Sequence, residues 1–113
     1  MICECEVQII EILDDSFYPG ICKAVLEDCC NQKHYFVDKI PVLAGVYRDE
    51  ILKLPFSGYI RAEVINDFGD AIKINTEKPD DIESENGCYS FIVLKEKIRC
   101  CDACYRRDYN RNE

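Results

Sequence analysis

The residues best suited to chemistry are the cysteines near the carboxyl end, in the run Cys100-Cys101-Asp102-Ala103-Cys104. Cys101 and Cys104 have the C-x-x-C spacing at which two thiolates reach one zinc ion or form a local disulfide. A structural zinc site needs four ligands, usually from a second close pair, and no other cysteine pair in the chain has that gap. The sequence therefore predicts no cofactor and no metal, with Cys100, Cys101 and Cys104 as weak candidates for metal or thiol chemistry.

The other cysteines fit a structural role. The chain holds nine cysteines, an odd number, and its amino-terminal residues lack the basic and apolar regions of a secretory signal. Cys3, Cys5 and Cys22 fall on the apolar faces of predicted strands, where cysteine behaves as a small buried hydrophobe. We therefore expect free thiols in a reducing, cytoplasmic environment.

Catalytic groups are hard to find in this sequence. His34 is the only histidine and could in principle act as a general base beside a cysteine. Nothing in the spacing places a particular cysteine next to it, and no set of nucleophile, base and orienting group is complete. The sequence predicts no catalytic residue and a protein that is not an enzyme.

An acidic run dominates the charge pattern. Asp80, Asp81, Glu83 and Glu85 surround Ile82, without the spacing of an EF-hand loop. Residues 1–96 contain 9 Lys and Arg against 19 Asp and Glu, a net charge of −10. Such a surface repels nucleic-acid phosphates and attracts basic partners. The run is interpreted either as a solvated loop or as a contact surface for a basic protein.

Aromatic residues support two functional hypotheses. In the first, Tyr59 and Tyr89 provide the desolvated centre of an interface whose acidic part is the run around Ile82. The chain is then a non-enzymatic interaction protein, immunity-like or accessory, that binds a basic protein. In the second, Tyr35, Phe36 and Phe91 join these tyrosines as stacking platforms of an OB-like nucleic-acid-binding module. The acidic charge argues against the second hypothesis, because it repels nucleic-acid phosphates.

The elements that position these residues are predicted to be strands. Period-two alternation and polar turns indicate about six of them, over 2–13, 21–27, 33–39, 58–64, 71–76 and 88–94. They predict an all-β fold, a small antiparallel barrel of OB or SH3 type with at most one short helical turn. The alternation slips near Ile9–Ile10, which predicts a bulge that bends the first strand.

Further expectations concern the connections between the strands and the ends of the chain. Pro41 should end the third strand and begin an irregular crossing segment, with the short helical turn at residues 47–52. The last strand is apolar on both faces and should lie inside the sheet. Residues 1–96 form one domain, and 97–113 a frayed tail that contains cysteine and arginine. No apolar run reaches the length needed to span a membrane.

Two stretches carry a resemblance. They are Tyr35-Phe36-Val37-Asp38-Lys39-Ile40-Pro41-Val42 and Lys78-Pro79-Asp80-Asp81-Ile82-Glu83-Ser84-Glu85-Asn86-Gly87. Together with the strand at 58–64 they resemble small uncharacterised bacterial proteins of this length, over roughly residues 6–96. No activity is assigned to those proteins, so the resemblance implies no catalytic residue. Some of them resemble immunity-type or accessory proteins.

Overall fold

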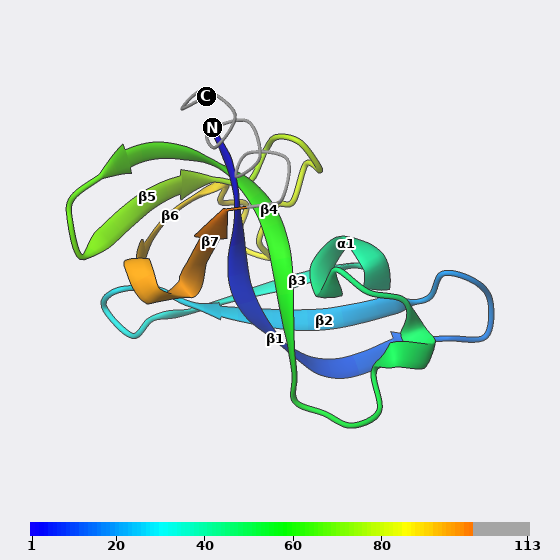
Figure 1. The fold of residues 1–113 in the computed structure, drawn as a ribbon. Helices are drawn as coiled ribbons and strands as arrows, with labels where there is room; N and C mark the ends of the chain where they lie inside the picture. The colour runs from blue at the N-terminus through cyan, green and yellow to red at the C-terminus, as the bar shows by residue number, and fades with distance from the viewer. Residues whose placement is uncertain (101–113) are drawn as a thin grey trace, which may run out of the picture.

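The computed structural model describes residues 1–100, except for the side chain of Cys100, and shows one curled antiparallel sheet (Figure 1). Its strands are β1 (Ile2–Asp14), β2 (Ile21–Glu27), β3 (Lys33–Lys39), β4 (Phe56–Asp67), β5 (Ala71–Asn75), β6 (Ser90–Leu94) and β7 (Ile98–Cys100). Their order is β3-β2-β1-β4-β5-β6, and β7 pairs with β1. Six longer strands thus make a half-barrel, which confirms the predicted all-β fold.

The long first strand serves both parts of the half-barrel. Its first half, from Ile2 to Ile9, pairs with β4, and its second half pairs with β2. The register with β2 shifts between Ile9 and Glu11, which confirms the predicted bulge. Because a bulge increases the local twist, β1 can turn from one set of neighbours to the other.

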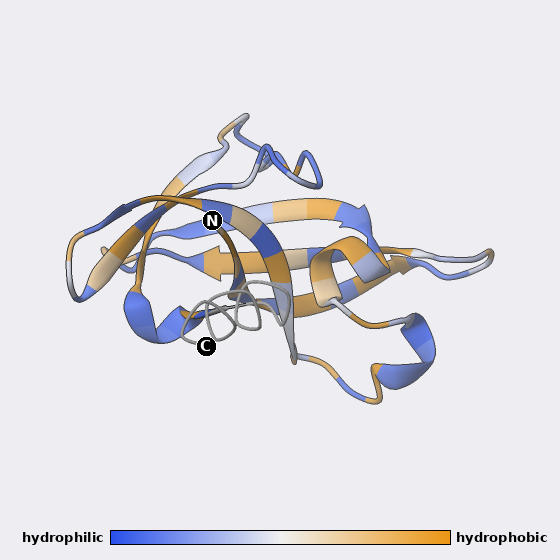
Figure 2. Ribbon diagram, turned by 45° about the horizontal axis from the view of Figure 1, so that its top comes forward, coloured by the Kyte–Doolittle hydropathy of each residue, from blue (hydrophilic) through white to orange (hydrophobic). Residues whose placement is uncertain are grey.

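One hydrophobic core fills the concave side of the sheet. Along the strands, hydrophobic and hydrophilic bands alternate (Figure 2), and the inward residues are almost fully buried. Cys3, Cys5 and Cys22 are among them, as predicted for small apolar side chains. Burial raises the pKa of Cys5 to about 12 and that of Cys22 to about 11, so both thiols stay protonated at neutral pH.

The irregular crossing predicted after Pro41 is wrong, because a short helix, α1 (Ile40–Ala44), begins there. Proline is tolerated in the first turn of a helix, where no backbone N–H is needed. The predicted turn within residues 47–52 is confirmed as the 3-10 helix η1 (Arg48–Glu50). Among the described residues, no helix is long and apolar enough to cross a membrane.

Helix α1 packs directly against β4 at Gly58. A Cβ atom at this glycine would lie 2.7 Å from the Cα of Ala44 and 3.0 Å from the carbonyl oxygen of Leu43. Only a residue without a side chain lets the two backbones approach this closely. Leu43 and Ala44 thereby reach the core.

Two predictions about the carboxyl-terminal strands are wrong. β6 lies at the end of the strand order rather than inside the sheet, and its Ile92 and Leu94 are each 38% exposed. After the 3-10 turn η2 (Lys95–Lys97), β7 pairs with β1 in the register Glu4 to Arg99. The ordered sheet therefore continues past the expected tail boundary at residue 97, because three residues are too few to show periodicity.

The edge strands β3 and β6 each accept a backbone hydrogen bond from a neighbouring loop. The backbone N–H of Cys29, in the β2–β3 turn, donates to the carbonyl of Ile92 on β6 at 2.8 Å. The N–H of Glu85 donates to the carbonyl of Tyr35 on β3, also at 2.8 Å. Between the two edges, the rings of Phe36 and Phe91 meet edge to face, 5.6 Å apart.

Candidate functional site

The segment between β5 and β6 that carries the acidic run is anchored at both ends. The backbone N–H of Thr76 donates to the carbonyl of Tyr89 at 2.8 Å, and the buried Thr76 hydroxyl donates to the carbonyl of Ile82. Ile82 itself is 1% exposed and packs into the core. The apolar residue at the centre of the run therefore fixes the loop, and the flanking carboxylates point outward.

The four carboxylates of this loop do not form one continuous acidic surface. Asp80 binds Arg61 through two contacts, at 3.0 and 2.6 Å. Glu85 lies 3.6 Å from the ammonium nitrogen of Lys23. Two of the four carboxylates predicted as contact residues are thus paired within the molecule, which reduces the negative field that the sequence predicts at this loop.

The other two carboxylates gather around Tyr89. The Tyr89 hydroxyl donates to Asp81 at 2.7 Å. This hydrogen bond, with the nearby charges of Asp81, Glu83 and Glu77, raises the pKa of Tyr89 to about 12. We call Glu77, Asp81, Glu83 and Tyr89 the Tyr89 cluster; Glu77 is the member that the sequence interpretation missed. Its backbone N–H is oriented by the Asn75 side chain at 2.9 Å.

Tyr59 has different neighbours from Tyr89. It lines a cleft of about 370 Å³ together with Glu4, Arg61 and Asp80, next to the start of α1. The guanidinium of Arg99 covers its ring, with the central carbon 3.5 Å from the ring centroid. One face of Tyr59 is therefore already occupied by a cation from the same chain.

Charges alternate across the outer face of the sheet beside this cleft. Arg99 on β7 donates to Glu4 on β1 at 2.8 Å, and Glu4 stands opposite Arg61 on β4 in the strand register. Arg61 in turn binds Asp80. The row Arg99–Glu4–Arg61–Asp80 links three strands to the acidic loop and is close to neutral overall.

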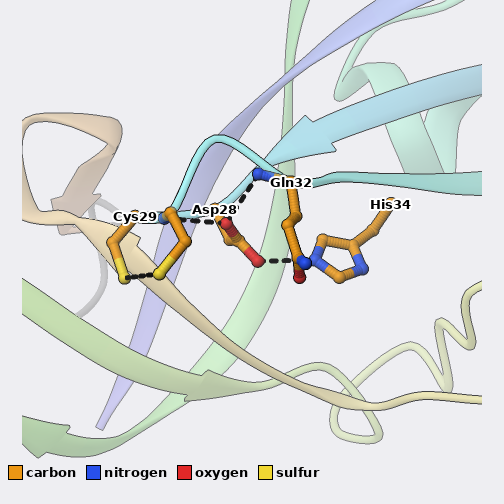
Figure 3. A network of polar contacts seen from close by, with 5 residues as sticks. Asp28, Cys29, Gln32 and His34 are labelled. Carbon is orange, nitrogen blue, oxygen red and sulfur yellow. Dashed lines mark hydrogen bonds and ion pairs between the residues drawn. The ribbon is translucent and has the colours of Figure 1, made fainter.

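His34 and the two cysteines of the β2–β3 turn share one carboxylate neighbour (Figure 3). Nε2 of His34 lies 2.8 Å from Asp28, and the imidazole packs on Phe91 at 4.9 Å. In Figure 3 Cys29 lies on the opposite side of Asp28 from the imidazole, and the Cys30 sulfur is 3.9 Å from the Cys29 sulfur. His34 therefore orients a turn and is not placed to activate either thiol.

The Asp28 carboxylate organises this turn. Its Oδ1 accepts hydrogen bonds from the backbone N–H groups of Cys30 and Gln32, each at 2.9 Å. Partial burial alone would raise the pKa of Asp28, but the bonds from His34, Gln32 and Cys30 together lower it below its usual value. The charged carboxylate is the form that this turn requires.

The structure also reveals an aromatic end of the molecule that the sequence interpretation did not single out. Phe17 is 69% exposed and Tyr18 78%, in the β1–β2 loop, and Tyr47 before η1 is 51% exposed. Tyr18 and Tyr47 stack with their ring centroids 5.9 Å apart, and Arg48 binds Asp15 at 3.2 Å beside them. Two adjacent aromatics in an otherwise polar turn were the sequence signal.

The weak metal candidates Cys100, Cys101 and Cys104 lie at or beyond the end of the described residues. Within residues 1–100, no group of three or more His, Cys, Asp or Glu side chains could hold a metal ion. Cys101 and Cys104 lie outside the described residues, and Cys100 is described only as a strand residue of β7.

Neither a protein-family model, nor a curated protein, nor a solved structure matches this chain. The resemblance of residues 35–42 and 78–87 to small bacterial proteins stays a prediction.

Proposed function

We propose that this protein is a non-enzymatic interaction protein that binds a basic protein partner through the Tyr89 cluster. An immunity-like or accessory role is the biological setting in which such a protein fits. The proposal includes a cytoplasmic location, because free cysteines persist in reducing compartments.

The carboxylates around the Tyr89 hydroxyl are the observation that carries this proposal. Asp81 and Glu83 are exposed, as is Glu77, and all three raise the pKa of Tyr89. A cation that approaches this cluster meets several carboxylates and the edge of a half-buried aromatic ring. Tyrosine beside a charged rim is typical of protein interfaces, where the ring contributes affinity and the charges speed association.

The remaining predicted contact residues would act differently. Asp80 and Glu85 engage Arg61 and Lys23, so a partner cation would first have to displace an internal one. Tyr59 would offer only the face that Arg99 leaves open. We therefore assign these three residues to the periphery of the interface and the Tyr89 cluster to its centre.

The alternatives receive less support from the geometry. An OB-like nucleic-acid module needs a basic groove beside its aromatic platforms, whereas Arg61 and Arg99 are bound to Asp80 and Glu4. A metal or thiol protein that uses Cys101 and Cys104 would depend on residues outside the described part of the chain.

The test compares two variants with the same change in net charge. Asp81→Asn/Glu83→Gln neutralises the centre of the proposed interface, and Asp70→Asn/Glu96→Gln neutralises two exposed carboxylates elsewhere. Immobilised full-length protein captures partners from a lysate of its source cell at low salt, and the captured proteins are identified by mass spectrometry. Association rates are then measured with the purified partner.

We expect the first variant to associate roughly tenfold more slowly with a basic protein, and the second to resemble wild type. The difference should shrink at high salt, where surface charges are screened. Capture of nucleic acid alone, or equal rates for the two variants, would contradict the proposal.

A further inference from the structure

The β2–β3 turn presents two adjacent thiols. The sulfur atoms of Cys29 and Cys30 lie 3.9 Å apart, and both cysteines are free (Figure 3). Cys30 is exposed and Cys29 is partly exposed, so a small molecule can reach the pair. Neither side chain belongs to the core.

The turn is held in place by contacts that do not involve sulfur. Oδ1 of Asp28 accepts hydrogen bonds from the backbone N–H groups of Cys30 and Gln32, and its Oδ2 lies within hydrogen-bond distance of His34. The N–H of Cys29 is fixed to the carbonyl of Ile92 on β6. The two sulfurs are therefore held by a preorganised backbone. A ligand that bridges them binds without a large loss of backbone conformational entropy.

Adjacency disfavours a disulfide between these cysteines. Consecutive Cα atoms are about 3.8 Å apart across a trans peptide bond, below the range of roughly 4.4 to 6.8 Å that disulfides adopt. A disulfide between Cys29 and Cys30 would be strained, and strained disulfides are readily reduced. The pair is better suited to a single bridging atom, which does not require direct contact of the sulfurs.

The number and type of the sulfur donors determine which bridging atom fits this pair. Zinc in a structural site takes four ligands, but among the described residues no group of three or more His, Cys, Asp or Glu side chains, at this turn or elsewhere, could hold a metal ion. Soft thiolate donors select soft, thiophilic ions. Trivalent arsenic needs only two protein sulfurs when it keeps one organic substituent.

We propose that Cys29 and Cys30 form a two-sulfur binding site for a thiophilic trivalent arsenical. With the hydrated arsenical R–As(OH)₂, two As–S bonds form and two As–O bonds break. Each thiol proton leaves with a hydroxide as water, so two waters are released. Neither arsenic nor sulfur changes oxidation state, and no further reactant is needed. This site is independent of the Tyr89 cluster.

Other described cysteines are poor competitors for this ligand. Cys3 and Cys5 lie two residues apart on one strand, but both are at most 1% exposed. Cys88 is exposed, without a second described thiol bonded to it. Cys101 and Cys104 have a chelating spacing in the sequence, so the experiment must distinguish them from the turn.

The test titrates reduced, full-length protein with phenylarsine oxide and follows the adducts by native mass spectrometry. Tandem mass spectrometry of the intact chain then locates the arsenic. We expect an adduct at residues 29–30 in wild type, at least tenfold weaker binding there in Cys29→Ser and in Cys30→Ser, and no change in Cys88→Ser. Serine preserves the backbone contacts of Asp28, and circular dichroism checks that each variant is folded.

Three outcomes would overturn the proposal. The arsenic could map only to residues 100–104, or the Cys30→Ser variant could bind at residues 29–30 as wild type does. In a parallel sample, treatment with diamide could produce a Cys29–Cys30 disulfide that excess glutathione fails to reduce. That result would assign the pair to a stable disulfide instead.

Discussion

The guanidinium of Arg99 lies over the ring of Tyr59, with its central carbon 3.5 Å from the ring centroid, and the same guanidinium donates to Glu4 at 2.8 Å. One side chain from β7 thus binds residues on β4 and β1. The contact explains why residues beyond the expected end of the domain belong to the sheet, although the pattern of the sequence assigns them to the tail.

Removing β7 should therefore destabilise the protein. A chain that ends after residue 97 loses the strand pairing with β1, the cation–π contact on Tyr59 and the ion pair with Glu4. We expect a loss of about 1 to 2 kcal/mol in the free energy of unfolding, measured by urea denaturation. A chain that ends after residue 100 is the matched control and should keep most of the stability. Equal midpoints for the two chains would show that β7 contributes nothing.

The Tyr89 cluster predicts a shifted titration. The pKa of Tyr89 is about 12 against an ordinary value of 10.0, chiefly because its hydroxyl donates to Asp81. In Asp81→Asn the pKa should fall toward 10.0, which near-ultraviolet absorbance detects when the signal of Tyr89→Phe is subtracted. Any stability that the raised pKa gives is fully present below pH 10.0 and is lost as the pH rises through 12. An unchanged titration in Asp81→Asn would rule out the hydrogen bond as the cause.

The hydrogen bonds of Asp28 predict that the stability of the protein depends on pH in the acidic range. Its pKa is lowered from 3.8 in the folded protein, so its contribution is present above that value and is lost as the pH falls below it. Asp28→Asn should cost about 2 kcal/mol at neutral pH, where three hydrogen bonds to a charged group are weakened. The difference from wild type should shrink as the pH falls below 3.8, measured in a series of urea unfolding curves. Asp70→Asn, at an exposed turn, should show no such convergence.

Gly58 predicts a steric effect at the contact between α1 and β4. In Gly58→Ala the added methyl would meet the backbone of Ala44 at 2.7 Å, and backbone cannot rotate away. We expect a loss of about 2 kcal/mol in the free energy of unfolding, seen as a lower thermal midpoint.

Gly69 provides the comparison, because a Cβ there meets nothing within 4 Å but φ is +102°. Gly69→Ala should cost about 1 kcal/mol from backbone strain alone. A Gly58→Ala variant as stable as wild type would contradict the close approach.

The strands were the predictable part of this fold because their signal is local. Alternation along 21–27 and 33–39 predicts β2 and β3 with the observed bounds, and the slip at Ile9 predicts the bulge. A helix over residues 40–44 was missed because Pro41 was interpreted as a terminator. The same proline is compatible with a first helical turn, and which role it takes depends on the packing of Leu43 and Ala44.

The candidate site was less predictable because its charges are paired across the chain. Asp80 and its partner Arg61 are 19 residues apart, and no sequence pattern joins Glu85 to Lys23. The acidic run predicts a local concentration of negative charge, but the fold decides which carboxylates remain facing solvent. The pairing of Arg99 with Glu4 spans 95 residues and is equally invisible in the sequence.

The loop contacts at the edges of the half-barrel have a consequence for self-association. An open strand edge is a template on which a second chain can add a strand, the route to polymers and fibres. Here the β2–β3 turn occupies the Ile92 carbonyl on one edge, and the acidic loop occupies the Tyr35 carbonyl on the other. A second copy that added to either strand at these points would first have to displace a loop anchored by Asp28 or Ile82. The loops that carry the candidate binding residues thus also obstruct the addition of a strand at these two points.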